Sequence, residues 1–132
     1  MTSGEAPVIA VVRDLFFVAR IKETARLAGV PLVFARTPEE LTARLAEPAR
    51  FVLLDLTAGF DYDALFAAAD AAGAPVLAFT THALAKQTQP LHARCTRVVT
   101  KETLTQELGG ILASGRVREP DAEPARARDA AP

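Results

Sequence analysis

The sequence contains a single cysteine, Cys95, among its 132 residues. No disulfide bond can form within the chain, so a reducing compartment is the expected setting. No apolar stretch approaches the roughly 20 residues that a membrane-spanning helix needs, and residues 1–7 lack the basic start and apolar middle of a signal peptide. We therefore expect a cytoplasmic protein without a membrane partner. Cys95 is expected to be a half-buried packing residue rather than a catalytic thiol.

An excess of charge of one sign is also missing. The formal net charge is −1 and the pI is about 6.1, whereas a nucleic-acid-binding domain usually carries a strongly basic face. We therefore expect no nucleic-acid partner. The sequence has no Gly-rich phosphate loop, no GxSxG motif and no nearby Cys/His pair, which disfavours nucleotide hydrolysis and nucleophilic hydrolase chemistry. His92 has no companion at metal-ligand spacing, so no zinc site is expected.

The composition favours one folded domain. Half of the residues are hydrophobic, enough for a core in a chain of this length. We place the domain at residues 7–113. Residues 1–6 and 114–132 are expected to be disordered, because the latter segment mixes Pro, Ala and balanced charge without periodicity.

Short apolar runs alternate with helical patterns along the domain. The runs are typical of strands that are buried on both faces of a sheet, and they occupy residues 8–12, 31–35, 51–55, 75–80 and 97–100. Helices are predicted after each run, within residues 15–29, 37–47, 61–73, 83–95 and 102–113. Five repeats of strand then helix predict a five-stranded parallel sheet with helices on both faces, a doubly wound α/β fold.

Individual residues sharpen the helix predictions. Thr37, with Pro38 after it and Glu40 three residues on, is typical of a helix start. Asp61 or Asp63 is expected to begin the third helix. Pro90 predicts a kink or two short helical pieces in the fourth segment, and two adjacent glycines weaken the fifth.

Polar residues follow four of the predicted strands, where ligands and chemistry collect in parallel sheets. They are Arg13 and Asp14, Asp55, Thr80 and Thr81, and Thr100 and Lys101. The order along the chain is an acid after the first strand, an acid ending the third, a hydroxyl ending the fourth and a lysine after the fifth. With this order, residues 7–113 resemble the receiver domain of two-component response regulators, which has the CheY-like fold. The matching stretches are VVRDL, FVLLDLT, VLAFTTHA and VVTKETL.

The resemblance implies a role for each of these residues. Asp55 is the candidate phosphoacceptor. Lys101 would pair with the Asp55 carboxylate before phosphorylation and with the phosphoryl group afterwards. Thr80 would bind a phosphoryl oxygen, while Asp14 and Asp55 would hold Mg²⁺. Thr81 and His82 would lie at the pocket rim, although a solvated or capping histidine is the simpler interpretation of His82.

Three positions depart from the family pattern. Arg13 replaces the first acid of the metal-binding pair, so we predict that Mg²⁺ binding is weak or absent. Its guanidinium either turns inward to form a fork with Asp55 or Asp14, or points to solvent. Glu102 follows Lys101 where receivers usually carry proline, and it could compete for the lysine. Val98 replaces the aromatic switch residue of the fifth strand.

Three hypotheses follow. The first is a stand-alone atypical receiver-like signalling module, a pseudo-receiver that acts by binding other proteins and has a degraded phosphorylation site. It would be a monomer or weak homodimer that presents the fourth helix, fifth strand and fifth helix to its partners.

The second hypothesis is a functional response regulator that is phosphorylated on Asp55 in a phosphorelay. A histidine kinase would be its candidate partner, and it would catalyse at most slow autophosphorylation and autodephosphorylation. The third is a flavodoxin-like domain that binds an unrelated ligand. The first two require no organic cofactor.

The adjacent aromatics Phe16 and Phe17 cannot both face one side of a helix. We predict that one packs inward and that the other stays near the surface, where it could mark a contact patch.

Overall fold

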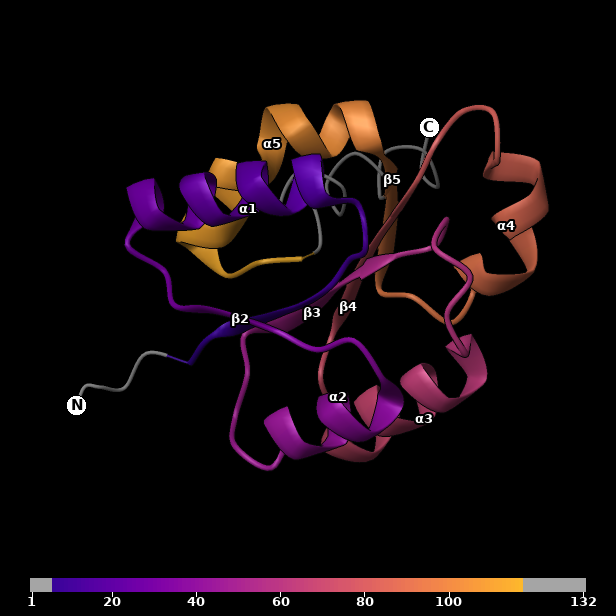
Figure 1. Cartoon of the computed structure of the whole chain (residues 1–132), viewed down its shortest axis with the longest axis horizontal. Helices are drawn as coiled ribbons and strands as arrows, with labels where there is room; N and C mark the ends of the chain where they lie inside the picture. Colours follow the sequence, from indigo (N-terminus) through magenta and orange to yellow (C-terminus); the bar gives the residue numbers. More distant parts are fainter. Residues whose placement is uncertain (1–5, 118–132) are drawn as a thin grey trace, which may run out of the picture.

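The computed structural model describes residues 6–117. Within this range strands and helices alternate along the chain (Figure 1), as the sequence predicts. In chain order they are β1 Val8–Val11, α1 Leu15–Ala28, β2 Leu32–Phe34, α2 Pro38–Arg44, β3 Phe51–Asp55, α3 Tyr62–Ala72, β4 Val76–Thr80, α4 Ala85–His92, β5 Arg97–Thr100 and α5 Lys101–Ser114.

All five strands form one parallel sheet in the order β2-β1-β3-β4-β5. Helices α1 and α5 lie side by side on one face, while α2 and α3 cover the other face (Figure 1). The predicted doubly wound fold is confirmed. Because the strands are parallel, the loops that follow β1, β3, β4 and β5 meet at one edge of the sheet.

The alternation of side chains along the strands divides the core into two layers. Ala10 and Leu53 pack under α1 and α5, whereas their neighbours Ile9 and Leu54 pack under α2 and α3. This period of two is what an extended strand produces. Since both faces are covered, β1, β3 and β4 are buried throughout, which explains why their sequences are continuous apolar runs.

Side-chain caps begin most of the helices. The hydroxyl of Thr37 accepts a hydrogen bond from the Glu40 N–H at 3.0 Å, and Asp61 caps α3 by accepting from the Ala64 N–H. Both helix starts were predicted from the sequence. Asp14 and Thr100 cap α1 and α5 in the same way, which places two residues of the predicted site at helix N-termini.

The fourth segment does not divide into two short helical pieces, because α4 is one helix with Pro90 inside it, and the alternative of a kink stays a prediction. Pro90 lies near the end of this short helix, so its missing N–H removes only one late backbone hydrogen bond. Helix α5 likewise runs unbroken through Gly109 and Gly110. Its buried face, which includes Leu108 and Ile111, packs into the core and offsets their low helix propensity.

The C-terminal end of the described range belongs to the fold. Helix α5 includes Ser114, and Val117 is buried in the core, so the packed region extends beyond the predicted boundary at residue 113. The disorder expected for residues 1–5 and 118–132 concerns residues outside the described range. Within residues 6–117 no helix has the length and apolar character needed to cross a membrane.

Candidate functional site

The carboxyl edge of the sheet brings the predicted site residues to one end of the molecule. Arg13 and Asp14 lie between β1 and α1, while Asp55 and Thr80 are the last residues of the neighbouring strands β3 and β4. Lys101 is the first residue of α5, directly after β5. This placement agrees with the sequence prediction, but the contacts among these side chains differ from it.

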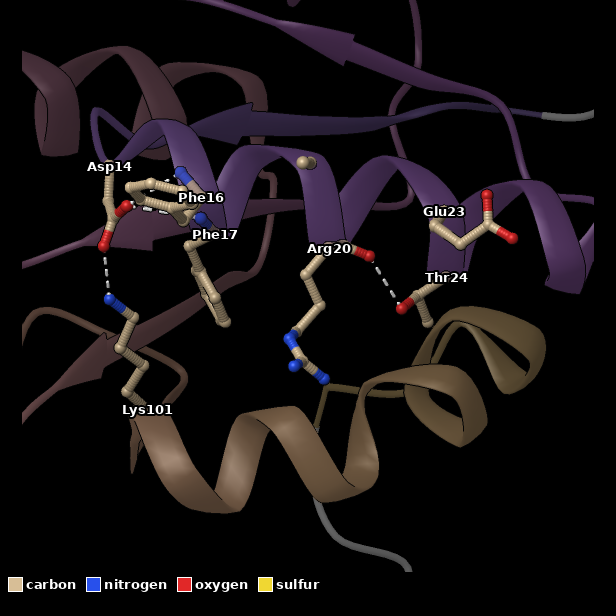
Figure 2. A pocket seen from close by; sticks show the side chains of 8 residues that line it. Asp14, Phe16, Phe17, Arg20, Glu23, Thr24 and Lys101 are labelled. Carbon is tan, nitrogen blue, oxygen red and sulfur yellow. Dashed lines mark hydrogen bonds and ion pairs between the residues drawn. The ribbon is translucent and has the colours of Figure 1, made fainter.

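Asp14 and Lys101 form the ionic half of the site (Figure 2). Lys101 Nζ donates to Asp14 Oδ2 at 2.6 Å, while Asp14 Oδ1 accepts from the backbone N–H groups of Phe16 and Phe17 at the start of α1. The hydrogen bond from Lys101, followed by that from the Phe17 N–H, lowers the pKa of Asp14 below its ordinary value. Both oxygens of Asp14 are therefore already bonded.

The expected pairing of Lys101 with Asp55 is wrong for this structure. Helices α1 and α5 pack against each other, so the cap of α1 and the first residue of α5 lie side by side. The ammonium group of Lys101 also lies 4.9 Å from the centre of the Phe17 ring. A hollow of about 600 Å³ adjoins this pair along α1, and Asp55 is not among the residues that line it.

Asp55 is bonded within its own loop instead. Its carboxylate is buried, with 3% of the residue exposed, and Oδ1 accepts hydrogen bonds from the Thr57 N–H at 2.8 Å and the Thr57 hydroxyl at 2.6 Å. The Tyr62 hydroxyl donates to the backbone oxygen of Asp55 at 2.7 Å. Within residues 6–117 the Asp55 carboxylate forms no ion pair.

Thr80 is connected to α4 rather than to Lys101. Its hydroxyl lies 3.1 Å from the Thr88 hydroxyl, which is 2.8 Å from His92 Nε2. Thr80 and Thr88 are buried, and His92 is half-buried. Together, Asp55, Thr57, Thr80, Thr88 and His92 form the hydroxyl half of the site, in which the described contacts involve no cationic Lys or Arg.

The rim residues Thr81 and His82 act locally in the structure. The Thr81 hydroxyl accepts a hydrogen bond from the Leu84 N–H at 3.2 Å, which fixes the turn before α4. His82 is exposed, and its backbone oxygen accepts from the Ala85 N–H at 3.4 Å. A role for either side chain toward a phosphoryl group stays a prediction.

Arg13 does not form the inward fork with Asp55 or Asp14, and it is exposed, in keeping with the alternative that it points to solvent. Its Nη1 donates to the backbone oxygen of Ala58 at 2.6 Å, and its guanidinium lies 4.5 Å from the centre of the Phe60 ring. The side chain is exposed, yet it is tied to the loop between β3 and α3. Arg13 therefore connects the residues that follow β1 to the loop that follows Asp55, and it forms no paired hydrogen bonds with the carboxylate of Asp14 or Asp55.

The donor set does not fit Mg²⁺, the ion that the family resemblance implies. Mg²⁺ needs an octahedral shell of oxygen ligands. One Asp14 oxygen binds Lys101 and the other caps α1, while Arg13 replaces the first acid of the pair. Within residues 6–117 no group of three or more His, Cys, Asp or Glu side chains is arranged to hold a metal ion.

The other departures from the family pattern have no partner in the site. Glu102 lies exposed in the first turn of α5 and forms no ion pair within the described residues, so it does not compete for Lys101. Val98 is paired with Ala78 and packs against the core layer under α2 and α3. Cys95 packs against the same layer, and burial raises its pKa to about 11, as expected for an unactivated thiol.

Sequence reasoning missed several residues that shape the site. Thr57 follows Asp55 by two positions, a spacing that favours a local hydrogen bond between the side chain of Asp55 and the following backbone. Thr88 and His92 are four residues apart, which places them on the same face of a helix. Those two signals were present in the sequence, whereas nothing in it pointed to the Tyr62 and Phe60 contacts.

No protein-family model matches the chain, and no curated protein matches it in sequence. Similar solved structures do exist. The receiver domain of the sensor histidine kinase PA1611 from Pseudomonas aeruginosa PAO1, with a magnesium ion in its active-site cleft, gives a TM-score of 0.67 at 17% identity, covering 84% of this chain and 97% of that one. The phosphorylated cyanobacterial phytochrome response regulator RcpA gives 0.59 at 19% identity, with coverage of 84% and 91%.

A third similar structure comes from a family of redox sensors in the streptococci that evolved from two-component response regulators. It gives a TM-score of 0.66 at 9% identity and covers 83% of this chain and 51% of that one. These likenesses show that the chain has the fold of response regulator receiver domains. At such low identities they show the fold alone.

Proposed function

We propose that this protein is an atypical receiver-like signalling module that acts by binding other proteins, with a phosphorylation site that no longer works with Mg²⁺. Receiver domains are generally non-enzymatic signalling modules. The observation that carries the proposal is the 2.6 Å ion pair between Lys101 and Asp14, because it occupies the cation that would otherwise neutralise Asp55.

Phosphoryl transfer to a carboxylate brings negative charge onto negative charge, so it depends on positioning and neutralisation by cations. Here the Asp55 carboxylate is bonded to Thr57. The two cations that the sequence offered as its partners, Arg13 and Lys101, bind the Ala58 carbonyl and Asp14. The geometry favours one fixed state over a state that responds to phosphorylation.

Helix α1 carries exposed apolar side chains that could take part in binding a partner. Within residues 6–117 the large exposed hydrophobic side chains are Leu15, Phe16 and Leu27, and all three belong to α1. Phe16 is 90% exposed while its neighbour Phe17 is 4% exposed, which confirms the predicted division between the two aromatics. We propose that α1 contributes to partner binding, in addition to the α4, β5 and α5 surface expected from the family resemblance.

The second candidate function is a working phosphoacceptor with Asp55 as nucleophile and a histidine kinase as partner. It is favoured by one observation: within the described residues Asp55 Oδ2 accepts no hydrogen bond. That oxygen lies at the end of β3, beside the strand that ends in Thr80. An attacking oxygen is therefore available if the surrounding loops rearrange around it.

One experiment separates the two functions. The protein is incubated with acetyl phosphate or beryllofluoride and Mg²⁺, and its intact mass is followed together with the amide signals of Asp14, Asp55, Thr80 and Lys101. The proposal predicts no adduct and no shift at millimolar Mg²⁺. A Mg²⁺-dependent adduct that is lost in Asp55→Asn would establish the phosphoacceptor function instead.

A further inference from the structure

A second cavity is lined by Arg13 and by none of the residues of the hydroxyl half. It has a volume of about 550 Å³, within the range of small-molecule sites. Its walls come from the ends of β1 and β2, from α1, and from the loop between β3 and α3. This position, beyond the carboxyl ends of the strands, is where open parallel sheets bind ligands.

The cavity combines apolar walls with positive charge. Leu15 and Val18 from α1 line it together with the rings of Phe34 and Phe60. Leu15 is 79% exposed, and no described residue covers it. An apolar surface of this kind gains free energy when a ligand removes it from water.

Every ionisable side chain that lines the cavity is a cation, namely Arg13, Lys22 and Arg36. Lys22 and Arg36 form no ion pair within residues 6–117. The carboxylate of Glu40 accepts a hydrogen bond from the Arg36 backbone N–H at 2.7 Å, but Glu40 lines a neighbouring groove and not this cavity. In a chain of net charge −1, three cations around one apolar cavity make a locally positive site.

One of these cations is held in place before any ligand arrives. The guanidinium of Arg13 is fixed by the Ala58 carbonyl at 2.6 Å and by the face of Phe60 at 4.5 Å. A cation that is already ordered loses little conformational entropy on binding an anion. Arginine also binds carboxylate and phosphate groups through paired hydrogen bonds.

We propose that this cavity binds a small organic anion, with a carboxylate or phosphate group at Arg13, Lys22 and Arg36 and a flat apolar body against Phe34, Phe60 and Leu15. The site is separate from Asp55 and needs neither phosphorylation nor Mg²⁺. The proposal thus goes beyond partner binding, and it gives the module a ligand to which it can respond.

The test uses amide spectra of the full chain during titration with AMP, which carries a phosphate, and with 1-naphthoate, which carries a carboxylate. Saturable shifts at Arg13, Leu15, Phe34, Arg36 and Phe60 with either compound are expected, and the compound that binds identifies the headgroup. Adenosine and inorganic phosphate should each bind at least about tenfold more weakly than AMP, because each lacks one half of the ligand.

Matched variants locate the site. Combining Lys22→Gln with Arg36→Gln should weaken binding about tenfold or more, whereas Lys86→Gln, which removes an exposed cation on α4, should leave it unchanged. Leu15→Ala should weaken binding while Leu27→Ala should not, since both leucines are exposed on α1 and only Leu15 lines the cavity.

Three results would overturn the proposal. They are the absence of saturable shifts with both anions at millimolar concentration, binding of adenosine or inorganic phosphate as tight as that of AMP when AMP binds, and equal losses in the cavity variants and their controls. In each variant, unchanged amide signals of β3 and β4 would show that the fold is retained.

Discussion

The ionic half and the hydroxyl half of the site contain one aspartate each, and the two aspartates are held in opposite ways. Asp14 is partly exposed, caps a helix and binds a lysine at 2.6 Å. Asp55 is buried and bonded to the backbone and hydroxyl of Thr57 in its own loop. The resemblance to receiver domains implies that Lys101 pairs with Asp55, yet in this structure Lys101 forms its ion pair with Asp14.

The difference shows that the position of a carboxylate at a strand end does not decide its chemistry. What decides it is whether a cation reaches the carboxylate. In this molecule the packing of α1 against α5 brings Lys101 to the cap of α1. In the ionic half both oxygens of Asp14 are bonded, whereas Asp55 Oδ2 in the hydroxyl half accepts no hydrogen bond within the described residues. No described hydrogen bond or ion pair joins the two halves.

The largest expected effect concerns Phe17, the buried aromatic residue beside Lys101 of the ionic half. Phe17 is buried, its ring lies under Lys101, and it packs edge-on against Phe79 with ring centres 4.9 Å apart. We expect Phe17→Ala to lower the free energy of unfolding by about 3–5 kcal/mol, measured by urea denaturation.

The neighbouring aromatic provides the matched control for this variant. Phe16 is 90% exposed, so Phe16→Ala should change the free energy of unfolding by about 0.5 kcal/mol or less. Similar losses in the two variants would contradict the described burial of Phe17.

The next effect sharpens the account of the hydroxyl half. Thr88→Val keeps the shape of the side chain but removes the hydroxyl that lies between Thr80 and His92. Because Thr80 is buried, the loss leaves a buried hydroxyl without its partner, and we expect a cost of about 1–3 kcal/mol in urea denaturation. Thr105→Val, which removes an exposed hydroxyl on α5, is the control and should be nearly neutral. An equal cost at both positions would show that the buried hydroxyl contacts are unimportant.

A smaller effect is expected in the ionic half, and it depends on pH. The pKa of Asp14 is lowered in the folded state, first by the hydrogen bond from Lys101. The stability that Asp14 contributes is therefore present above its ordinary pKa of about 3.8, and it is lost as the pH falls through the lower folded value. Since the Asp14 side chain is 38% exposed, we expect a contribution of at most about 1 kcal/mol.

The measurement for the ionic half is an NMR titration of the Asp14 carboxyl group. In Lys101→Gln its pKa should rise toward the ordinary value, and the acid-dependent part of the stability should shrink. Lys86→Gln, which removes an exposed cation on α4, should leave the titration of Asp14 unchanged. An Asp14 pKa that does not change in Lys101→Gln would contradict this account, because the hydrogen bonds of the helix cap alone would then lower that pKa.

The smallest expected effect concerns the loop that follows Asp55. Arg13→Ala removes the hydrogen bond to the Ala58 carbonyl and the contact with Phe60. An exposed contact between a cation and a ring contributes about 0.5–1 kcal/mol, so amide hydrogen exchange at Ala58 should become severalfold faster. Arg20→Ala, on the exposed part of α1, should not alter it. Unchanged exchange in Arg13→Ala would mean that Tyr62 holds the loop by itself.

The sequence was sufficient to predict the order and type of every element in the described range, because apolar runs and helical patterns alternate along it. The third strand was predicted with its observed bounds, since the buried run ends at Asp55. Pro90 led us to expect two short pieces as one alternative for α4, but α4 is a single helix, because a proline near the end of a short helix costs less than one in its middle.

The side-chain partners in the site could not be predicted in the same way. The choice of Lys101 between Asp14 and Asp55 depends on which helices pack together, and the position of Arg13 depends on the path of a loop. Local pairs such as Asp55 with Thr57 were within reach of sequence reasoning, because only two residues separate them.

The separation of the two halves is tested most directly by a Mg²⁺ titration of the full chain, followed through the amide signals of Asp14, Asp55 and Lys101. Arg13→Asp, which restores a second acid after β1, serves as the comparison. We predict that the wild-type signals do not respond at millimolar Mg²⁺, since Lys101 and the cap of α1 occupy both oxygens of Asp14. Saturable shifts at Asp14 and Asp55 in the wild-type protein would contradict the account.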